Sequence, residues 1–336
     1  MYRHTLRFAF AVFCGLLLFS TRGEAQSLNF TTIDVPCAAC PGGIARSTTA
    51  QGINPAGDIV GGYRDAVGAA HGFVLRGGQF ASIEVPGAIA GAAGSLPTTA
   101  RSINPAGDIV GNYTTPLNTS APADSPAYCP ATGSVACIKG FLYSGGKFST
   151  VLVPDHPGAI PQRISPDGDI FGCLHDFDLM GSMFGFGRTR FGYISLKPSG
   201  GELADSSKSV PDSMNNGATP DGHTVVGLWT DMTTGHSHGY VVQDGNFNSY
   251  DVPGSLGTNI WDINPSGAFV GVYTDSSKKV HGFLQLPDGS APVTINFPNA
   301  VSTAAFGINP GGAIVGQYTD TSGHTHGFLA TPTGVQ

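Results

Sequence analysis

The chain has 336 residues, of which 49 are glycine and 24 are proline; 12% are charged and 40% are hydrophobic. This composition excludes an intrinsically disordered chain, which is poor in apolar residues, and a coiled coil or helical bundle, which needs Glu, Lys and Leu in quantity. The formal net charge of −7 argues against a nucleic-acid-binding protein, which needs a basic surface. Short runs of Val, Ile, Phe and Tyr between Gly, Pro, Asn and Asp predict an all-β protein.

Residues 1–25 have the features of a secretory signal peptide. The basic residues Arg3 and Arg7 lead into an apolar run at 8–19, and small residues precede Gln26 at the −3 and −1 positions. The apolar run is too short to span a membrane, so we expect a secreted chain, extracellular or periplasmic, with no membrane span after cleavage. Cleavage leaves 13 basic and 22 acidic residues, a charge of −9, which disfavours nucleic acid and an anionic membrane surface as partners.

Five cysteines remain in the expected mature chain. Cys129 and Cys137 lie eight residues apart in one polar loop and are the pair most suited to a disulfide after export. Cys37 and Cys40 could form a local disulfide; metal or redox use is the alternative, although no second CxxC and no His pair accompanies them. Cys173, inside an apolar run, is expected to be a buried and inert thiol.

Three motifs recur six times along the chain. The first, typified by GINPAGDIVGGY, begins at residues 52, 102, 163, 217, 262 and 307. The second, typified by His-Gly-Phe, begins at residues 71, 139, 191, 238, 281 and 326. The third ends in Pro, mostly as Val-Pro, and occupies residues 30–36, 80–86, 148–154, 203–211, 247–253 and 293–298. Self-similarity at this spacing is typical of repeat architectures.

Each repeat predicts four short strands. One strand leads into an Asn-Pro-x-Gly turn, the second is the DIVGxY run, the third begins at His-Gly-Phe, and the fourth ends at Val-Pro. A four-stranded meander cannot cover its own two apolar faces, so six of them stacked radially predict a six-bladed β-propeller of four-stranded antiparallel blades. The third motif occurs once before the first Asn-Pro turn and is missing after the last, so an N-terminal strand is expected to complete the C-terminal blade. Residues 26–336 would form this single domain.

The repeat resembles a known family of secreted bacterial proteins. The pattern Ile-Asn-Pro-x-Gly-x-Ile-Val-Gly-x-Tyr followed by His-x-Phe-Leu is similar to the HAF-type extracellular repeat, named for its His-Ala-Phe triplet, and the similarity covers nearly all of the mature chain. Here the triplet is mostly His-Gly-Phe, and Lys139 and Phe191 replace the His. The resemblance implies export and a propeller-like fold, and it brings no agreed activity to particular residues.

The predicted topology separates two faces of the ring. The strand one–two and three–four turns are short and uniform, whereas the two–three loops on the other face include long insertions after Thr114 and His175. Four loops repeat an Asp followed by a His, for which we favour a structural hydrogen bond over catalysis because a catalyst needs one site and not four copies. These pairs are Asp65/His71, Asp231/His238, Asp275/His281 and Asp320/His326.

Departures from the repeat are the candidate ligand-binding residues. His175, Asp176 and Asp178 could bind Ca²⁺ or act as acid and base, or form a solvated loop. Trp229, and Trp261 beside Asp262, could be aromatic platforms for a sugar, although packing between blades is the commoner use of tryptophan. Residues on or just before the first strands could line a central channel; they are Arg46, Arg101, Arg163, Asn215, Asn259 and Asp262.

Two classes of function remain open. The first is a monomeric binding or scaffold module that recognises a glycan or surface partner on its long-loop face. The alternative is an extracellular hydrolase or lyase that acts on a polysaccharide or lactone at the mouth of the central channel. No GxSxG, HExxH, Walker or GxGxxG motif is present, so the catalytic residues are unknown and no cofactor is expected beyond a Ca²⁺ ion that could also stabilise the ring.

Overall fold

The computed structural model describes residues 27–88, 98–121, 136–153, 158–175, 183–189, 192–196, 213–231 and 233–333. These residues form 24 strands and one short 3₁₀ helix, η1 (Pro41–Gly43). In this part of the chain no helix is long and apolar enough to cross a membrane. The protein is therefore all-β, as the composition predicts.

The strands form six antiparallel units of four. Unit one consists of β2 (Ser47–Ile53), β3 (Ile59–Arg64), β4 (Ala70–Arg76) and β5 (Gln79–Ile83). Unit two consists of β6 (Thr98–Ile103), β7 (Ile109–Pro116), β8 (Ala136–Ser144) and β9 (Lys147–Val151). Unit three consists of β10 (Ala159–Ile164), β11 (Ile170–His175), β12 (Met183–Thr189) and β13 (Gly192–Leu196). Units four and five consist of β14 (Ser213–Ala218), β15 (Thr224–Thr230), β16 (Ser237–Gln243) and β17 (Asn246–Tyr250), and of β18 (Gly257–Ile263), β19 (Phe269–Thr274), β20 (Val280–Gln285) and β21 (Val293–Ile295).

Unit six combines both ends of the described chain. It consists of β22 (Ser302–Ile308), β23 (Ile314–Thr319), β24 (Thr325–Pro332) and β1 (Leu28–Ile33). Strand β1 pairs with β24 along its whole length, from Leu28 opposite Pro332 to Ile33 opposite Gly327. A single parallel pair, Ser47 opposite Thr325, joins this unit to unit one. The prediction that an N-terminal strand completes the C-terminal unit is confirmed.

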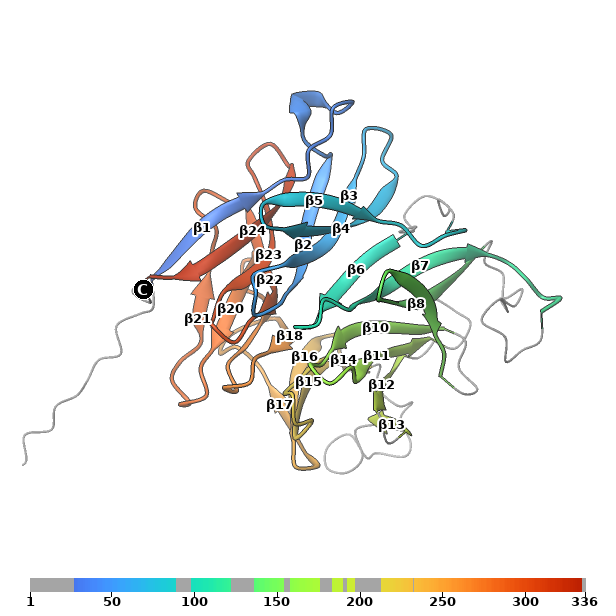
Figure 1. Ribbon diagram of the computed structural model, residues 1–336. Helices are drawn as coiled ribbons and strands as arrows, with labels where there is room; N and C mark the ends of the chain where they lie inside the picture. Colours follow the sequence, from blue (N-terminus) through green and yellow to red (C-terminus); the bar gives the residue numbers. More distant parts are fainter. Residues whose placement is uncertain are drawn as a thin grey trace, which may run out of the picture.

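The six units follow one another around a common centre (Figure 1). The first strand of each unit, namely β2, β6, β10, β14, β18 or β22, contacts the first strands of the units before and after it, and β22 contacts β2. We call these six strands the inner ring. The turns that follow these strands are Asn-Pro in four units, Ser-Pro in unit three and Thr-Pro in unit four, and they lie on one side of the ring, the turn face. The loops between the second and third strands lie on the other side, the loop face.

The Asn-Pro turn has a local cause in the sequence. In unit one the Gly57 N–H donates to the Asn54 carbonyl oxygen at 3.0 Å, and Gly57 has φ of 85°, which glycine adopts without strain. The Asn54 side-chain oxygen also accepts from the Asp58 N–H at 2.9 Å, so the buried amide fixes the turn. The same main-chain bond closes the turn of every other unit.

The core lies between neighbouring units. Val60 and Val74 of unit one pack in one cluster with Ile103 and Phe141 of unit two. Within a unit, the glycine of the DIVG run makes room for the aromatic ring of the His-Gly-Phe motif, because a Cβ at Gly61 would overlap the Phe73 ring and the Thr49 carbonyl oxygen. This pairing of Gly and aromatic ring recurs in at least four further units, so both repeat motifs are requirements of packing.

Candidate functional site

Every inner-ring strand contains a β-bulge at the same position of the repeat. The register against the second strand shifts by one residue there, between Ala50 and Gly52 in unit one for example. The bulged residues are Gln51, Arg101, Gln162, Asn216, Trp261 and Phe306. Bulges re-aim side chains and are common beside functional sites. The same backbone position of each inner-ring strand thus carries side chains of different kinds in different units.

Arg163 and Asp262 form an ion pair across the centre of the ring. Nη2 of Arg163, in unit three, lies 2.6 Å from Oδ2 of Asp262, in unit five, so the pair links two units that are not neighbours. Arg163 Nη1 also donates to the Ser102 hydroxyl of unit two at 3.2 Å, and Nη2 to the Phe306 carbonyl oxygen of unit six at 3.4 Å. Both charged side chains are buried, with residue exposures of 9% and 3%. One arginine therefore connects four units.

Burial dominates the electrostatics of this ion pair. It raises the pKa of Asp262 to about 6, although Arg163 and the N–H groups of Ile308 and Ile263 stabilise the carboxylate. Burial likewise lowers the pKa of Arg163, against the attraction of Asp262. On the turn-face side the pair lines a cavity of about 80 Å³ together with turn residues of all six units. That volume holds about two or three water molecules and no sugar ring.

An aromatic pair lies on the inner ring beside the ion pair. Trp261, the residue before Asp262, contacts Phe306 of unit six edge to face, with ring centroids 5.4 Å apart. Across the ring, the Nε–H of Arg101 donates to the Asn112 side-chain oxygen at 3.1 Å. The inner ring is therefore aromatic over units five and six and polar over unit two.

Unpartnered buried polar atoms concentrate on the same strands. In the described part of the chain, five buried side-chain atoms have no hydrogen-bond partner, and all five belong to β6, β10, β14 or β18; they are Thr99 Oγ1, Arg163 Nε, Ser213 Oγ, Asn216 Oδ1 and Asn259 Oδ1. An unpaired buried polar group costs about 1–3 kcal/mol. The inner-ring strands of units two to five thus have unused hydrogen-bonding capacity.

The residues expected to line a channel do not all lie at the centre of the ring. Arg163 and Asp262 meet at the centre, and Arg101 and Asn259 lie on the inner ring. Asn215 is also on an inner-ring strand, β14, but its side chain bonds within unit four and to unit three: it accepts from the Tyr240 hydroxyl and donates to the Phe186 carbonyl oxygen. Arg46 is exposed near the loop face, and its Nη1 donates to the Ala66 carbonyl oxygen at 3.4 Å.

The cluster proposed from His175, Asp176 and Asp178 lies largely outside the described residues. His175 ends β11, where its backbone pairs with Met183, and the two aspartates belong to the segment that the structure does not describe. Among the described residues, no three His, Cys, Asp or Glu side chains come close enough together to hold a metal ion.

Trp229 occupies the tyrosine position of the repeat. Its ring stacks on His238 with centroids 4.6 Å apart, and its Nε1–H donates to the Ser249 hydroxyl at 3.2 Å. Tyr63 of unit one makes the corresponding contacts with His71 and Ser82. Trp229 therefore replaces a structural tyrosine within unit four, whereas Trp261 lies on the inner ring.

The expected contacts between the repeated Asp and His side chains are present in three units. Nε2 of the histidine lies 3.3, 3.0 and 3.4 Å from the carboxylate in the pairs Asp65/His71, Asp275/His281 and Asp320/His326. For Asp231 and His238 the expectation is wrong. Asp231 accepts from the Thr233 N–H and the Thr234 hydroxyl, and His238 binds Asp251 at 2.8 Å.

Each of these histidines also has a partner that the sequence analysis missed. Nδ1 faces a side chain at the end of the fourth strand, namely Glu84, Asp251, Asn296 or Asp34. The signal was present in the sequence, because an acidic or amide residue precedes Val-Pro or Phe-Pro in these four repeats.

The described cysteines are in different states. Cys37 and Cys40 form a disulfide. Cys137 is also disulfide-bonded, while Cys129, its expected partner, lies outside the described residues. Cys173 carries a thiol that is fully buried in β11, and burial raises the pKa of this thiol to about 12. An inert thiol was expected there.

Comparison with protein-family models and with curated protein sequences gave no match. Among solved structures, the chain is similar to TolB from Acinetobacter baumannii, with 12% identity and a TM-score of 0.44 over 82% of this chain and 63% of that one, so it spans less than two thirds of TolB. It is similar to a gluconolactonase from Xanthomonas campestris, with 14% identity and a TM-score of 0.46 over 92% of this chain and 98% of that one. It is also similar to a Trypanosoma rangeli sialidase, with 10% identity and a TM-score of 0.46 over 93% and 60% of the two chains. These similar structures are β-propeller proteins.

Proposed function

We propose that the chain is a secreted, closed six-bladed β-propeller of the HAF repeat type that binds a glycan at its inner ring. The six four-stranded units, the contacts of each first strand with both neighbours, and the pairing of β1 with β24 support the closed ring. The signal-peptide features of residues 1–25 support export, and the repeat motif supports the family.

The observation that carries the ligand class is the group around Trp261. Its ring contacts Phe306, and the Asn216 Nδ2–H donates to the carbonyl oxygen of Ile260, the residue before Trp261, at 2.8 Å. The side-chain oxygens of Asn216 and of Asn259, two residues before Trp261, have no partner. A sugar ring offers an apolar face to aromatic rings and hydroxyl groups that donate to such oxygens.

One observation favours the enzymatic alternative, a hydrolase or lyase that acts on a polysaccharide or lactone. The pKa of Asp262 is raised to about 6, in the range that suits a general acid or base. However, Asp262 is held by Arg163 and by two main-chain N–H groups, which is what a structural carboxylate requires. We therefore favour binding without turnover.

A glycan array probed with the mature protein tests the proposal. Trp261→Ala should weaken binding to any glycan recognised by about five- to thirtyfold, because an aromatic contact contributes roughly 1–2 kcal/mol. Trp229→Tyr is the matched control, since it restores the repeat residue and should leave binding unchanged. Binding that is insensitive to Trp261→Ala would contradict the proposal. Cleavage of a recognised glycan that is lost in Asp262→Asn would favour the enzyme.

A further inference from the structure

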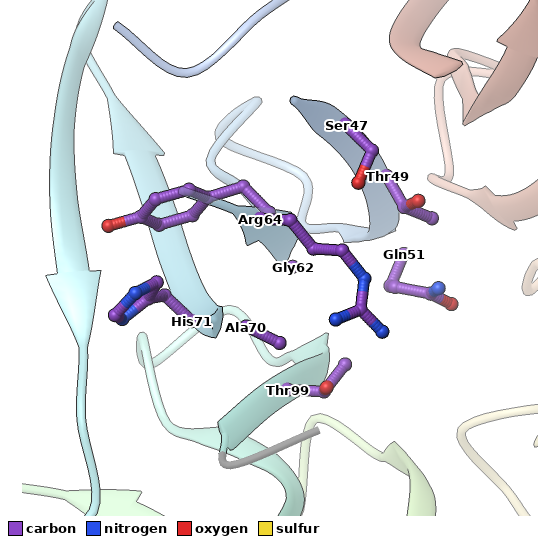
Figure 2. Close-up of a pocket in the computed structure, with 9 residues that line it drawn as sticks. Ser47, Thr49, Gln51, Gly62, Arg64, Ala70, His71 and Thr99 are labelled. Carbon is purple, nitrogen blue, oxygen red and sulfur yellow. The ribbon is translucent and has the colours of Figure 1, made fainter. Parts of the chain in front are cut away.

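A second pocket lies between units one and two, near the loop face. Its volume is about 110 Å³, and residues of β2, β3, β4 and β6 line it (Figure 2). Those that matter here are Thr49, Gln51, Gly62, Arg64 and Thr99. None of them belongs to the aromatic and amide group around Trp261.

The pocket exists because one repeat position is a glycine. Between units six and one, the Thr49 hydroxyl donates to Gln317 Oε1 at 2.7 Å. Between units one and two the same repeat positions hold Thr99 and Gly62, so no side chain reaches the threonine. Thr99 Oγ1 is left buried without a hydrogen-bond partner, in a residue that is 3% exposed.

The other units fill this position. Asn112, Cys173, Leu228 and Val272 stand where unit one has Gly62, so the opening is particular to one interface. A Cβ added at Gly62 would lie 3.5 Å from Thr99 Cγ2, an ordinary van der Waals distance, and the glycine does not have a positive φ. Neither crowding nor backbone strain at this position requires a glycine.

A second departure from the repeat supplies positive charge. Arg64 stands where four other units have threonine, and Figure 2 shows its side chain extending toward Gln51 and Thr99. Its Nη1 donates to the Gly68 carbonyl oxygen at 2.8 Å, and its other N–H groups have no hydrogen-bond partner in the described part of the chain. The neighbouring Asp65 carboxylate is directed to the N–H groups of Val67 and Ala69 and to His71.

We propose that this pocket binds a small carboxylate. One oxygen of the carboxylate would take the place that Gln317 Oε1 has beside Thr49, and would accept from the Thr99 hydroxyl. The other oxygen would accept from the guanidinium group of Arg64, a charge-assisted hydrogen bond. The volume admits a carboxyl group with a few further heavy atoms, as in a short hydroxy acid or the carboxyl end of an acidic sugar. The site is independent of the glycan site proposed at Trp261.

Ligand-observed NMR with glycolate and D-glucuronate as probes, and with glucose as the uncharged control, tests the proposal. The mature protein should bind a carboxylate probe at about millimolar affinity, as expected of so few heavy atoms, and should not bind glucose at this pocket. Binding of glycolate alone identifies a free hydroxy acid as the ligand class, whereas tighter binding of glucuronate identifies an acidic sugar.

Two substitutions taken from the repeat itself locate the site. Gly62→Gln copies Gln317 and should occupy the pocket, abolish carboxylate binding and raise the melting temperature, because Thr99 gains a partner and a strand glycine is removed. Arg64→Thr copies the other units and should weaken binding at least tenfold. Arg46→Thr removes a nearby arginine that does not line the pocket and should leave binding unchanged.

A reciprocal variant separates the cavity from the charge. Gln317→Gly should open the corresponding cavity between units six and one, where Thr319 stands in place of Arg64, and should create no second carboxylate site. The proposal is wrong if neither carboxylate binds the mature protein, or if binding survives both Gly62→Gln and Arg64→Thr. Glycan binding that depends on Trp261 should be unaffected by all of these changes, so failure here would not bear on that function.

Discussion

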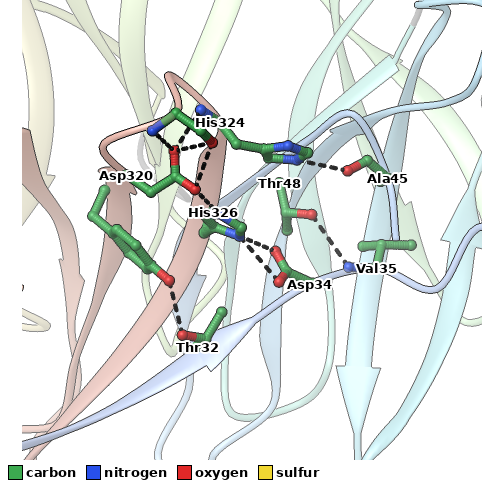
Figure 3. A network of polar contacts seen from close by, with 10 residues as sticks. Thr32, Asp34, Val35, Ala45, Thr48, Asp320, His324 and His326 are labelled. Atoms are coloured by element: carbon green, nitrogen blue, oxygen red, sulfur yellow. Dashed lines mark hydrogen bonds and ion pairs between the residues drawn. The ribbon is translucent and has the colours of Figure 1, made fainter. Parts of the chain in front are cut away.

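The imidazole of His326, in the last strand, binds the carboxylate of Asp34, 292 residues earlier, with Nδ1 2.9 Å from Oδ1 (Figure 3). The other ring nitrogen, Nε2, faces Asp320 at 3.4 Å. In the turn just before β24, the Nε2–H of His324 donates to the Ala45 carbonyl oxygen at 3.1 Å. The ring is thus closed by buried and half-buried polar contacts as well as by the main-chain pairing of β1 with β24.

Removing the N-terminal strand should open the ring. Deletion of residues 26–36 removes β1 and Asp34, which exposes the edge of β24 and leaves His326 with one partner. We expect a lower melting temperature and a broader transition by circular dichroism. A truncated protein that melts as the intact one does would contradict the closed ring.

A point substitution isolates the contribution of the histidine. His326→Ala leaves Asp34 partly buried without its partner, and should cost about 1–3 kcal/mol in urea denaturation. His223→Ala is the matched control, because the His223–Asp244 pair is mostly exposed and should contribute little. Equal losses in the two variants would mean that the contact of His326 with Asp34 has no special role.

The carboxylate of Asp320 should make stability depend on acid pH. Hydrogen bonds from the Ser322 side chain and the His324 N–H lower its pKa from 3.8 to about 2. The folded state therefore binds fewer protons than the unfolded state between these values, and the resulting stabilisation is present above 3.8 and disappears as pH falls toward 2. Thermal melts across this range should show a difference between the wild type and Asp320→Asn that is largest near neutrality and vanishes at low pH.

The ion pair at the centre should be costly to break and less costly to replace. Arg163→Met leaves a buried carboxylate unpaired and should destabilise the protein by about 3–5 kcal/mol. Adding Asp262→Asn removes the unpaired charge and keeps an oxygen that can accept from Ile308, so the double variant should recover part of the loss. Additive losses in a double-mutant cycle would show that the two side chains are not coupled.

Asp262 should make the stability of the Arg163→Met variant depend on pH with a sign opposite to that given by Asp320. The pKa of Asp262 is already raised to about 6 with Arg163 present, and Arg163→Met should raise it further. The folded variant then binds more protons than the unfolded chain, so its stability should fall as pH rises through and beyond 6. An unfolding free energy of the variant that, relative to wild type, does not change between acid and neutral pH would contradict this assignment.

The repeat alone predicted the units, their strand order and the pairing of the ends, because each depends on local turn residues and on counting motifs. The bulges could not be predicted in this way, since a bulge is a shift in register between two strands and Gln51 or Trp261 breaks no periodic pattern. Arg163 and Asp262 each stand out in the sequence, because each is a charged residue at a repeat position that is glycine in three other units. That they meet follows only from the closure of the ring, which brings units three and five together at its centre.

The roles of Trp229 and Gly62 could not be predicted from the sequence, for physical reasons. Trp229 and Trp261 look alike in the sequence because both are rare aromatic residues. In the structure, however, Trp229 is aligned with Tyr63, and it stacks on His238 as Tyr63 stacks on His71. Gly62 does not stand out in the sequence, because glycine is common in this chain. Its effect is seen only by comparison with Gln317, which fills the same repeat position at the neighbouring interface. A missing side chain becomes evident only when its expected partner, Thr99, is found unpaired.

Cys173 should be unreactive in the folded protein. Its side chain is fully buried, and burial raises the pKa of the thiol to about 12 although Arg101 and Gln162 favour the thiolate, so about one thiol in 10⁴ is ionised at pH 8. Iodoacetamide should not modify the native mature protein within hours, and should modify one cysteine per chain after unfolding in urea without a reductant, because Cys37, Cys40 and Cys137 are held in disulfides. Mass spectrometry of peptides distinguishes the outcomes. Rapid alkylation of native Cys173 would mean that β11 opens to solvent, and alkylation of Cys137 in the unfolded chain would contradict its disulfide.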